Sequence, residues 1–236
     1  MSAAGHTNLW NWDRLSATKL NGKKTAKVVV GIAMALVLVA IMSTALVQEA
    51  AHEWLGLALF ALLVVHVVLG RKWFSALFRG RWSIVRVLQV AMLAGLALCV
   101  VGQVASSLVL SKHAFGFLPA LPGAGWARRV HMLCSYWAFI FAFAHVGLHA
   151  RFPKPKAPGA LWAIRIAMIA IACFGAVSFA QLGLPLYLTG QVQFAAVDFG
   201  TPLPLTLTRY TSIAVLVTML FHYLRGAALA IGRQGN

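Results

Sequence analysis

Six long apolar runs constrain the fold of this chain more than any other feature. Each run holds about 20 residues with few charges, which is the length a helix needs to cross a ~30 Å hydrocarbon layer. Strands of a membrane β-barrel would be shorter and would alternate in polarity, and these runs do not alternate. The sequence therefore predicts an all-α membrane protein of six transmembrane helices. The expected spans are 28–47, 51–70, 87–110, 130–149, 161–181 and 210–231.

The formal charge of +16 does not indicate nucleic-acid binding, because the basic residues lie in the short connections between apolar runs. The chain has twenty Lys and Arg residues. In the predicted arrangement, four of these basic residues lie on one side of the membrane and the other sixteen lie on the opposite side. By the positive-inside rule, this bias predicts that both termini face the cytoplasm. The four basic residues of the outer side are Lys112, Arg128, Arg129 and Arg209.

The three cysteines, Cys99, Cys134 and Cys173, each lie inside an apolar run, and none belongs to a CxxC or CxxCH motif. Isolated cysteines of this kind usually behave as small hydrophobic residues. We therefore expect no disulfide framework, no zinc site and no covalently attached c-type haem. The polar, basic segment 1–27 is too long for a signal peptide of ordinary layout and is expected to be retained on the cytoplasmic side.

The histidines carry the functional prediction, because an ionisable side chain inside a membrane is a candidate site residue by default. His52 and His66 are fourteen residues apart in the second run, and His131 and His145 are fourteen apart in the fourth. Fourteen residues make about four helical turns and a rise of roughly 21 Å, so both imidazoles of a pair face nearly the same way.

The second and fourth helices are separated by one helix, so they run parallel. His52 is then level with His131 near the outer surface, and His66 is level with His145 near the inner one. Two imidazoles at one level are what bis-histidine ligation of haem iron requires, whereas zinc prefers four ligands. The spacing therefore predicts two b-type haems. The alternative for any single histidine is a hydrogen bond between helices.

Four further residues are candidates around these sites. His149 shares a helix face with His145 and is an alternative inner ligand, or a contact to a haem propionate or a quinone. His222 is a candidate for proton uptake to a quinone, or a histidine at the wet end of a helix. Arg128 and Arg129 precede His131 and could bind propionates, or simply anchor the helix at the interface.

Two stretches of the chain resemble a known family. Residues 51–74 carry HEWLG and a second histidine fourteen residues on, and residues 107–152 carry ARRVH, SYW and HVGLH. Together they resemble the flavinylation-associated cytochrome family over about 28–151. The resemblance implies a bacterial inner-membrane protein that relays electrons through two haems, with His52, His66, His131 and His145 as iron ligands. It also implies a redox partner, often an extracytoplasmic protein that carries covalent flavin. This chain has no flavin-attachment motif of its own.

The sequence thus divides into a cytoplasmic segment 1–27, a di-haem four-helix bundle 28–151, and two further helices in 152–236 with a long outer loop at 182–209. The leading prediction is transmembrane electron transfer between a quinone pool or redox partner on one side and an acceptor or donor on the other. One alternative is a stand-alone quinone-linked oxidoreductase that acts on a small molecule such as superoxide or ferric iron. Another is a haem-free transporter or structural subunit.

Overall fold

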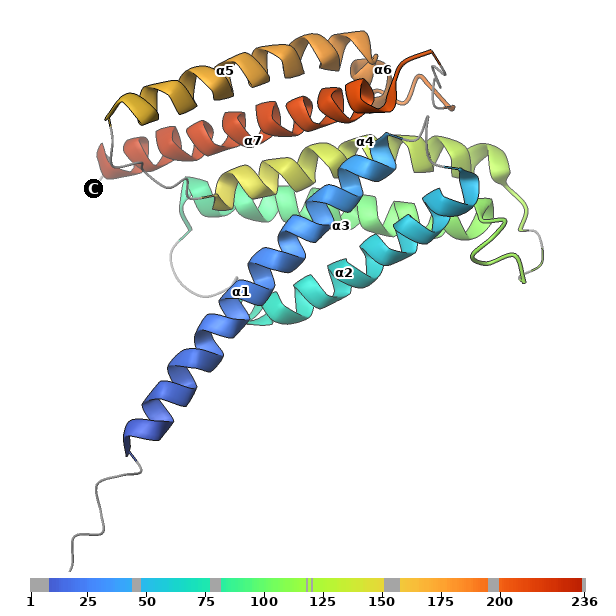
Figure 1. The fold of residues 1–236 in the computed structure, drawn as a ribbon. Coiled ribbons are helices and arrows are strands. Elements are labelled where there is room, and N and C mark those ends of the chain that lie inside the picture. Colours follow the sequence, from blue (N-terminus) through green and yellow to red (C-terminus); the bar gives the residue numbers. More distant parts are fainter. Residues whose placement is uncertain are drawn as a thin grey trace, which may run out of the picture. The chain divides into compact units, whose positions relative to one another are not determined.

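The structure, a computed structural model, describes residues 9–43, 48–76, 82–117, 119, 121–150, 158–194 and 200–234. These residues form seven α-helices and no strand (Figure 1), which confirms the all-α prediction. The helices are α1 (Leu9–Met42), α2 (Glu49–Ala76), α3 (Ile84–Leu110), α4 (Ala124–His149), α5 (Pro158–Gln181), α6 (Leu184–Leu188) and α7 (Leu203–Gln234).

Every helix except α6 is long and apolar enough to cross a membrane, so the chain is a multi-pass helical membrane protein. The candidate spans are Gly22–Met42, Glu49–Trp73, Ile84–Leu110, Ala124–His149, Gly159–Gln181 and Leu203–Ile231. Several helices begin before the apolar limits read from the sequence. For example, α7 begins at Leu203 rather than at 210. Hydropathy marks the part of a helix that suits hydrocarbon, whereas helical hydrogen bonding continues through the polar residues beside it.

The chain divides into two compact units, which are described separately. The first unit comprises residues 1–38 and 55–80, and so holds most of α1 and of α2. The second unit comprises residues 39–54 and 81–236. It holds the first residues of α2 and all of the helices from α3 to α7. The histidine pair predicted for the outer side, His52 and His131, lies entirely within this second unit.

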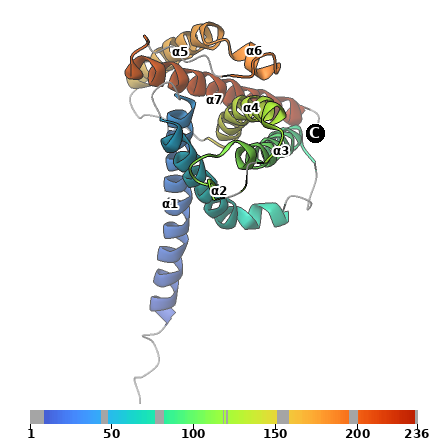
Figure 2. The same cartoon turned by 90° about the vertical axis from the view of Figure 1, so that its right-hand side faces the viewer.

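Within the second unit, the long helices pack as a row in the order α3, α4, α7 and α5 (Figure 1). Figure 2 looks along α3 and α4 and shows α7 above α4, with α5 beyond it. The short helix α6 packs against α4 and α5. The indole Nε1 of Trp137 on α4 donates a hydrogen bond to the carbonyl oxygen of Leu188, 2.9 Å away, at the end of α6. This row gives α4 a neighbour on each side.

Two glycines let α7 approach its neighbours closely. A Cβ added at Gly147 of α4 would collide with the carbonyl oxygen of Thr218 and would lie 3.1 Å from the backbone nitrogen of His222. A Cβ added at Gly175 of α5 would collide with the carbonyl oxygen of Ser212. Small residues at such crossings allow backbone-to-backbone packing in membranes, where association depends on close van der Waals contact.

The connection predicted over 182–209 is more ordered than expected. It contains α6, whose N-cap is Gly183 with φ 66° and whose second residue is Pro185. It also contains the beginning of α7, where Pro204 is the second helical residue. Proline suits the first turn of a helix because its missing N–H has no intrahelical acceptor there. Prolines at these two positions indicate the beginnings of helices, whereas the whole of 182–209 was predicted to be a loop.

A Gly175→Ala substitution should lower the apparent melting temperature in detergent, because the new methyl group would force α5 away from the backbone of α7. Overpacking of this kind typically costs about 1–3 kcal/mol. The matched control is Gly226→Ala on α7, where an added Cβ meets nothing within 4 Å. Thermal unfolding of both variants, followed by circular dichroism, tests the packing. Equal stability of the two variants would contradict it.

Candidate functional site

The candidate site is formed by one histidine from α2 and one from α4. His52 lies in the first turn of α2, and His131 lies in the second turn of α4. Their ring centroids are 6.0 Å apart, and the ring planes are inclined by 58°. Both side chains are half-buried. The prediction that these two residues meet, made from spacing and helix direction, agrees with this geometry.

The separation of the two rings suits a single metal ion held between them. An imidazole nitrogen binds a metal at about 2 Å, and the ring centre lies roughly 1 Å behind that nitrogen, so two opposed ligands place their centroids about 6 Å apart. The inclination of the ring planes does not oppose this, because each ring can rotate about its metal–nitrogen axis. The distance between the two rings is therefore compatible with a haem iron held by both imidazoles.

Neighbouring serines on α3 select one tautomer of His131. The Nδ1 atom of His131 lies 3.4 Å from the Oγ of Ser106 and 3.5 Å from the Oγ of Ser107. The hydroxyl of Ser106 already donates its proton to the carbonyl oxygen of Gly102 at 2.7 Å. Its oxygen is therefore an acceptor toward Nδ1, which favours the tautomer with the proton on Nδ1. The lone pair of His131 is then on Nε2, where a metal can bind it.

Further contacts fix the turn of α4 that carries His131. The Oγ of Ser135 donates to the carbonyl oxygen of His131 at 2.7 Å, and the Nε2 of Gln103 donates to that same Oγ at 2.5 Å. A Cβ added at Gly102 of α3 would lie 2.5 Å from the Sγ of Cys134. The two helices are therefore in close contact at this level, and the position of His131 is strongly constrained.

A hollow of about 200 Å³ opens beside His131. Its basic member is Arg128, whose guanidinium carbon lies 5.4 Å from the ring centroid of Phe194. Arg129 is exposed and does not line this hollow. Of the two arginines predicted as propionate partners, only Arg128 thus shares a space with His131. The lining residues are Leu110, Arg128, His131, Met132, Gln193 and Phe194.

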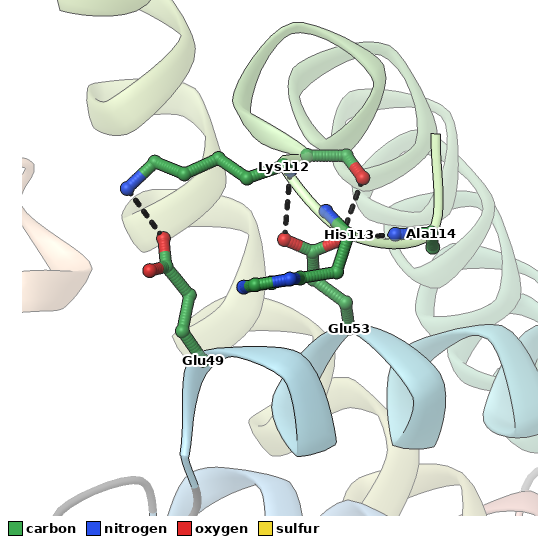
Figure 3. Close-up of polar contacts among 6 residues, drawn as sticks. Glu49, Glu53, Lys112, His113 and Ala114 are labelled. Atoms are coloured by element: carbon green, nitrogen blue, oxygen red, sulfur yellow. Dashed lines mark hydrogen bonds and ion pairs between the residues drawn. The ribbon is translucent and has the colours of Figure 1, made fainter. Parts of the chain in front are cut away.

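Two carboxylates in the first turns of α2 contact the segment that follows α3 (Figure 3). Glu49 forms an ion pair with Lys112, with a distance of 2.7 Å between Oε1 and Nζ. The carboxylate of Glu53 accepts hydrogen bonds from four groups in residues 111–114. Glu53 was not among the site residues predicted from the sequence. The available signal was its position beside His52 in a chain with only four acidic residues.

The residues of the second unit that were predicted to lie on the inner side are His145 and His149, in the last turns of α4, and His222, in the C-terminal half of α7. The rings of His145 and His149 have centroids 4.4 Å apart, and the Nδ1 of His149 lies 3.0 Å from the carbonyl oxygen of His145. His145 is half-buried, whereas His149 is exposed. The backbone of His222 lies against Gly147.

His66 is half-buried on α2 and belongs to the first unit, whereas His145 belongs to the second. Their pairing therefore stays a prediction. Among the residues that the structure describes, no group of three or more His, Cys, Asp and Glu side chains could hold a metal ion. A bis-histidine site needs only two.

No protein-family model matches this chain, and it matches no curated protein and no solved structure.

The tautomer of His131 provides a test that needs no bound cofactor. In protein expressed without haem supply, ¹⁵N NMR of labelled histidine should show His131 with a protonated Nδ1 and an unprotonated Nε2. Replacing both Ser106 and Ser107 by alanine should remove this preference, because the two oxygen atoms that lie near Nδ1 are then gone. If the wild-type chain already shows Nε2 protonated, the proposed role of the serines is wrong.

Proposed function

We propose that this chain is a membrane electron-transfer protein that holds two b-type haems, each between two histidines. The observation that carries the proposal is the outer pair, in which the rings of His52 and His131 are 6.0 Å apart. A bound haem iron supplies one-electron chemistry by changing between the ferric and ferrous states. The protein supplies the axial nitrogens, an apolar surrounding, and the groups that orient them.

At the outer site, His52 and His131 would hold the haem iron through their imidazole nitrogens. The contact with Ser106 favours a proton on Nδ1 of His131, and in that tautomer Nε2 would bind the iron. The hollow beside His131 brings the guanidinium of Arg128 to the same place. Because arginine binds carboxylates bidentately, Arg128 would hold a propionate, whereas Arg129 would serve as an interfacial anchor.

At the inner site, His66 and His145 would be the ligands. The support is their fourteen-residue spacing from the two outer histidines along α2 and α4. The half-buried position of His145 favours it over the exposed His149, since an axial ligand is enclosed within a bundle. His149 would then remain at the surface, close to the ring of His145.

The inner ends of α4 and α7 would exchange protons with a quinone. His222 can hold a proton on its imidazole. The guanidinium of Arg225 donates to the carbonyl oxygen of Ala150 at 3.4 Å, which joins α7 to the C-terminal end of α4. A quinone that gains or loses electrons must also gain or lose protons, and a histidine can supply them near neutral pH. We therefore propose that the quinone binds near His222 and the C-terminal end of α4.

The proposed location is the inner membrane of a bacterium, with both termini in the cytoplasm, on the strength of the positive charges in alternate connections. The sequence resemblance to the flavinylation-associated cytochrome family supports the same assignment. It also suggests the partner, an extracytoplasmic protein that carries flavin or another redox group. Such a partner would meet the outer site, where His52 and His131 lie.

Pyridine haemochrome analysis of the purified chain should give two b-type haems per polypeptide. His52→Ala and His131→Ala should each lower the ratio to one, because each variant leaves the outer site with a single ligand. His113→Ala is the matched control, since His113 is an exposed histidine just after α3 and should leave the ratio at two. A colourless wild-type chain, expressed with ample haem supply, would refute the proposal.

The purified chain should show no steady-state oxidation of quinol by superoxide or by ferric iron in the absence of a partner. Quinol should nevertheless reduce the haems, and this reduction can be followed in the visible spectrum. The reason is that a relay passes electrons on only when an acceptor protein is present. Sustained quinol-dependent turnover by the chain alone would favour the alternative function, a stand-alone quinone-linked oxidoreductase.

A further inference from the structure

The carboxylate of Glu53 is bound almost entirely by backbone groups (Figure 3). Its Oε2 accepts hydrogen bonds from the hydroxyl of Ser111 at 2.6 Å and from the backbone N–H groups of His113 at 3.0 Å and Ala114 at 2.8 Å. Its Oε1 accepts from the N–H of Lys112 at 2.9 Å. Three successive backbone N–H groups therefore converge on one carboxylate.

Successive N–H groups in a turn form a concave site for an anion. In this protein, the segment that follows α3 forms such a site, and Glu53 occupies it. The hydroxyl of Ser111 completes the site, and its oxygen also accepts from the N–H of Phe115 at 3.0 Å. Hydrogen bonds to an ionised group are stronger than those between neutral groups. Glu53 is therefore a firm attachment of α2 to this segment.

This attachment fixes the rotation of α2 at the level of His52. Neighbouring residues on a helix point about 100° apart around its axis. When Glu53 points into the turn after α3, His52 is directed to one side of that turn, where His131 of α4 lies. His52 needs this constraint because it lies in the first turn of its helix, and helix ends fray.

We propose that Glu53 is a positioning residue for the outer haem, because it holds the first turn of α2 so that His52 faces His131. This inference rests on the proposed function, since it concerns a ligand of the proposed haem. It assigns Glu53 no contact with the haem itself. Its effect is transmitted through the backbone of α2 to the adjacent imidazole.

Glu49 provides the matched control. It lies one turn before Glu53 on the same helix and contacts the same segment, through the side chain of Lys112. The two partners are 57% and 69% exposed, and an exposed ion pair contributes little to stability. A general effect of negative charge in this turn would appear in both Glu49→Gln and Glu53→Gln. A positioning effect would appear only in Glu53→Gln.

The experiment counts haems per chain in the full-length wild type and in these two variants, purified in the same detergent. The expected result is two haems in the wild type, two in Glu49→Gln and one in Glu53→Gln. Retention of the inner haem shows that Glu53→Gln has folded. Two haems with unchanged spectra in Glu53→Gln would overturn the inference alone. A wild type without haem would instead overturn the proposed function, and the inference with it.

Ser111→Ala is a milder variant that remains informative if Glu53→Gln fails to fold. It removes one donor to the carboxylate but keeps the charge and the backbone donors. Loss of an outer-shell partner typically weakens metal binding by about 10- to 100-fold, and we expect such a loss for the outer haem alone. The ferric low-spin EPR signal of that haem, which depends on the angle between the imidazole planes, should also shift. Wild-type affinity and an unshifted signal in Ser111→Ala would contradict the positioning role.

Discussion

An imidazole in a hydrocarbon layer needs polar partners, and the arrangement of α2, α3 and α4 at the outer site depends on this requirement. Burying an unpaired polar group costs several kcal/mol in an apolar medium, at about 4–8 kcal/mol for transfer to cyclohexane. His131 meets the requirement at Nδ1 through Ser106 and Ser107. In the proposed function, its other nitrogen binds the haem iron. The opposite ring of His52 would bind the same iron.

The serines can serve His131 only because α3 and α4 are very close together. Gly102 places the backbone of α3 against Cys134, and Gln103 reaches Ser135 across the same interface. Without a hydrophobic driving force between helices in lipid, such contacts must come from small residues and interhelical hydrogen bonds. Gly147 and Gly175 extend the same principle to α7, which gives α4 a fixed neighbour on its other side. The position of His131 is therefore a result of the whole row of helices.

Much of this could be predicted from the sequence. The number and type of the long helices follow from the length of the apolar runs, and the meeting of His52 with His131 follows from their spacing on two parallel helices. Helix ends were less predictable, because hydropathy does not report where backbone hydrogen bonding stops. The prolines at 185 and 204 could have indicated the beginnings of α6 and α7, since they suit the first turn of a helix.

The attachment of Glu53 could not have been predicted in the same way. Its partners are mainly backbone N–H groups, which every residue except proline possesses, so no residue pattern marks the turn that receives the carboxylate. Only the conformation of residues 111–114 reveals it. The sequence did place Glu53 beside His52, but adjacency on a helix gives no indication of which of two neighbouring carboxylates, Glu49 or Glu53, has a structural role.

The two ends of the proposed electron path differ in the groups that lie directly beside the candidate ligands. At the outer end, the Nδ1 atom of His131 is held by serines, and the carboxylate of Glu53 is enclosed by hydrogen-bond donors, so neither group is available to a diffusing substrate. At the other end, His149 is exposed and His222 lies on the adjacent helix. A partner that exchanges only electrons suits the outer end. A quinone, which exchanges protons together with electrons, suits the end where the exposed His149 lies directly beside the candidate ligand His145.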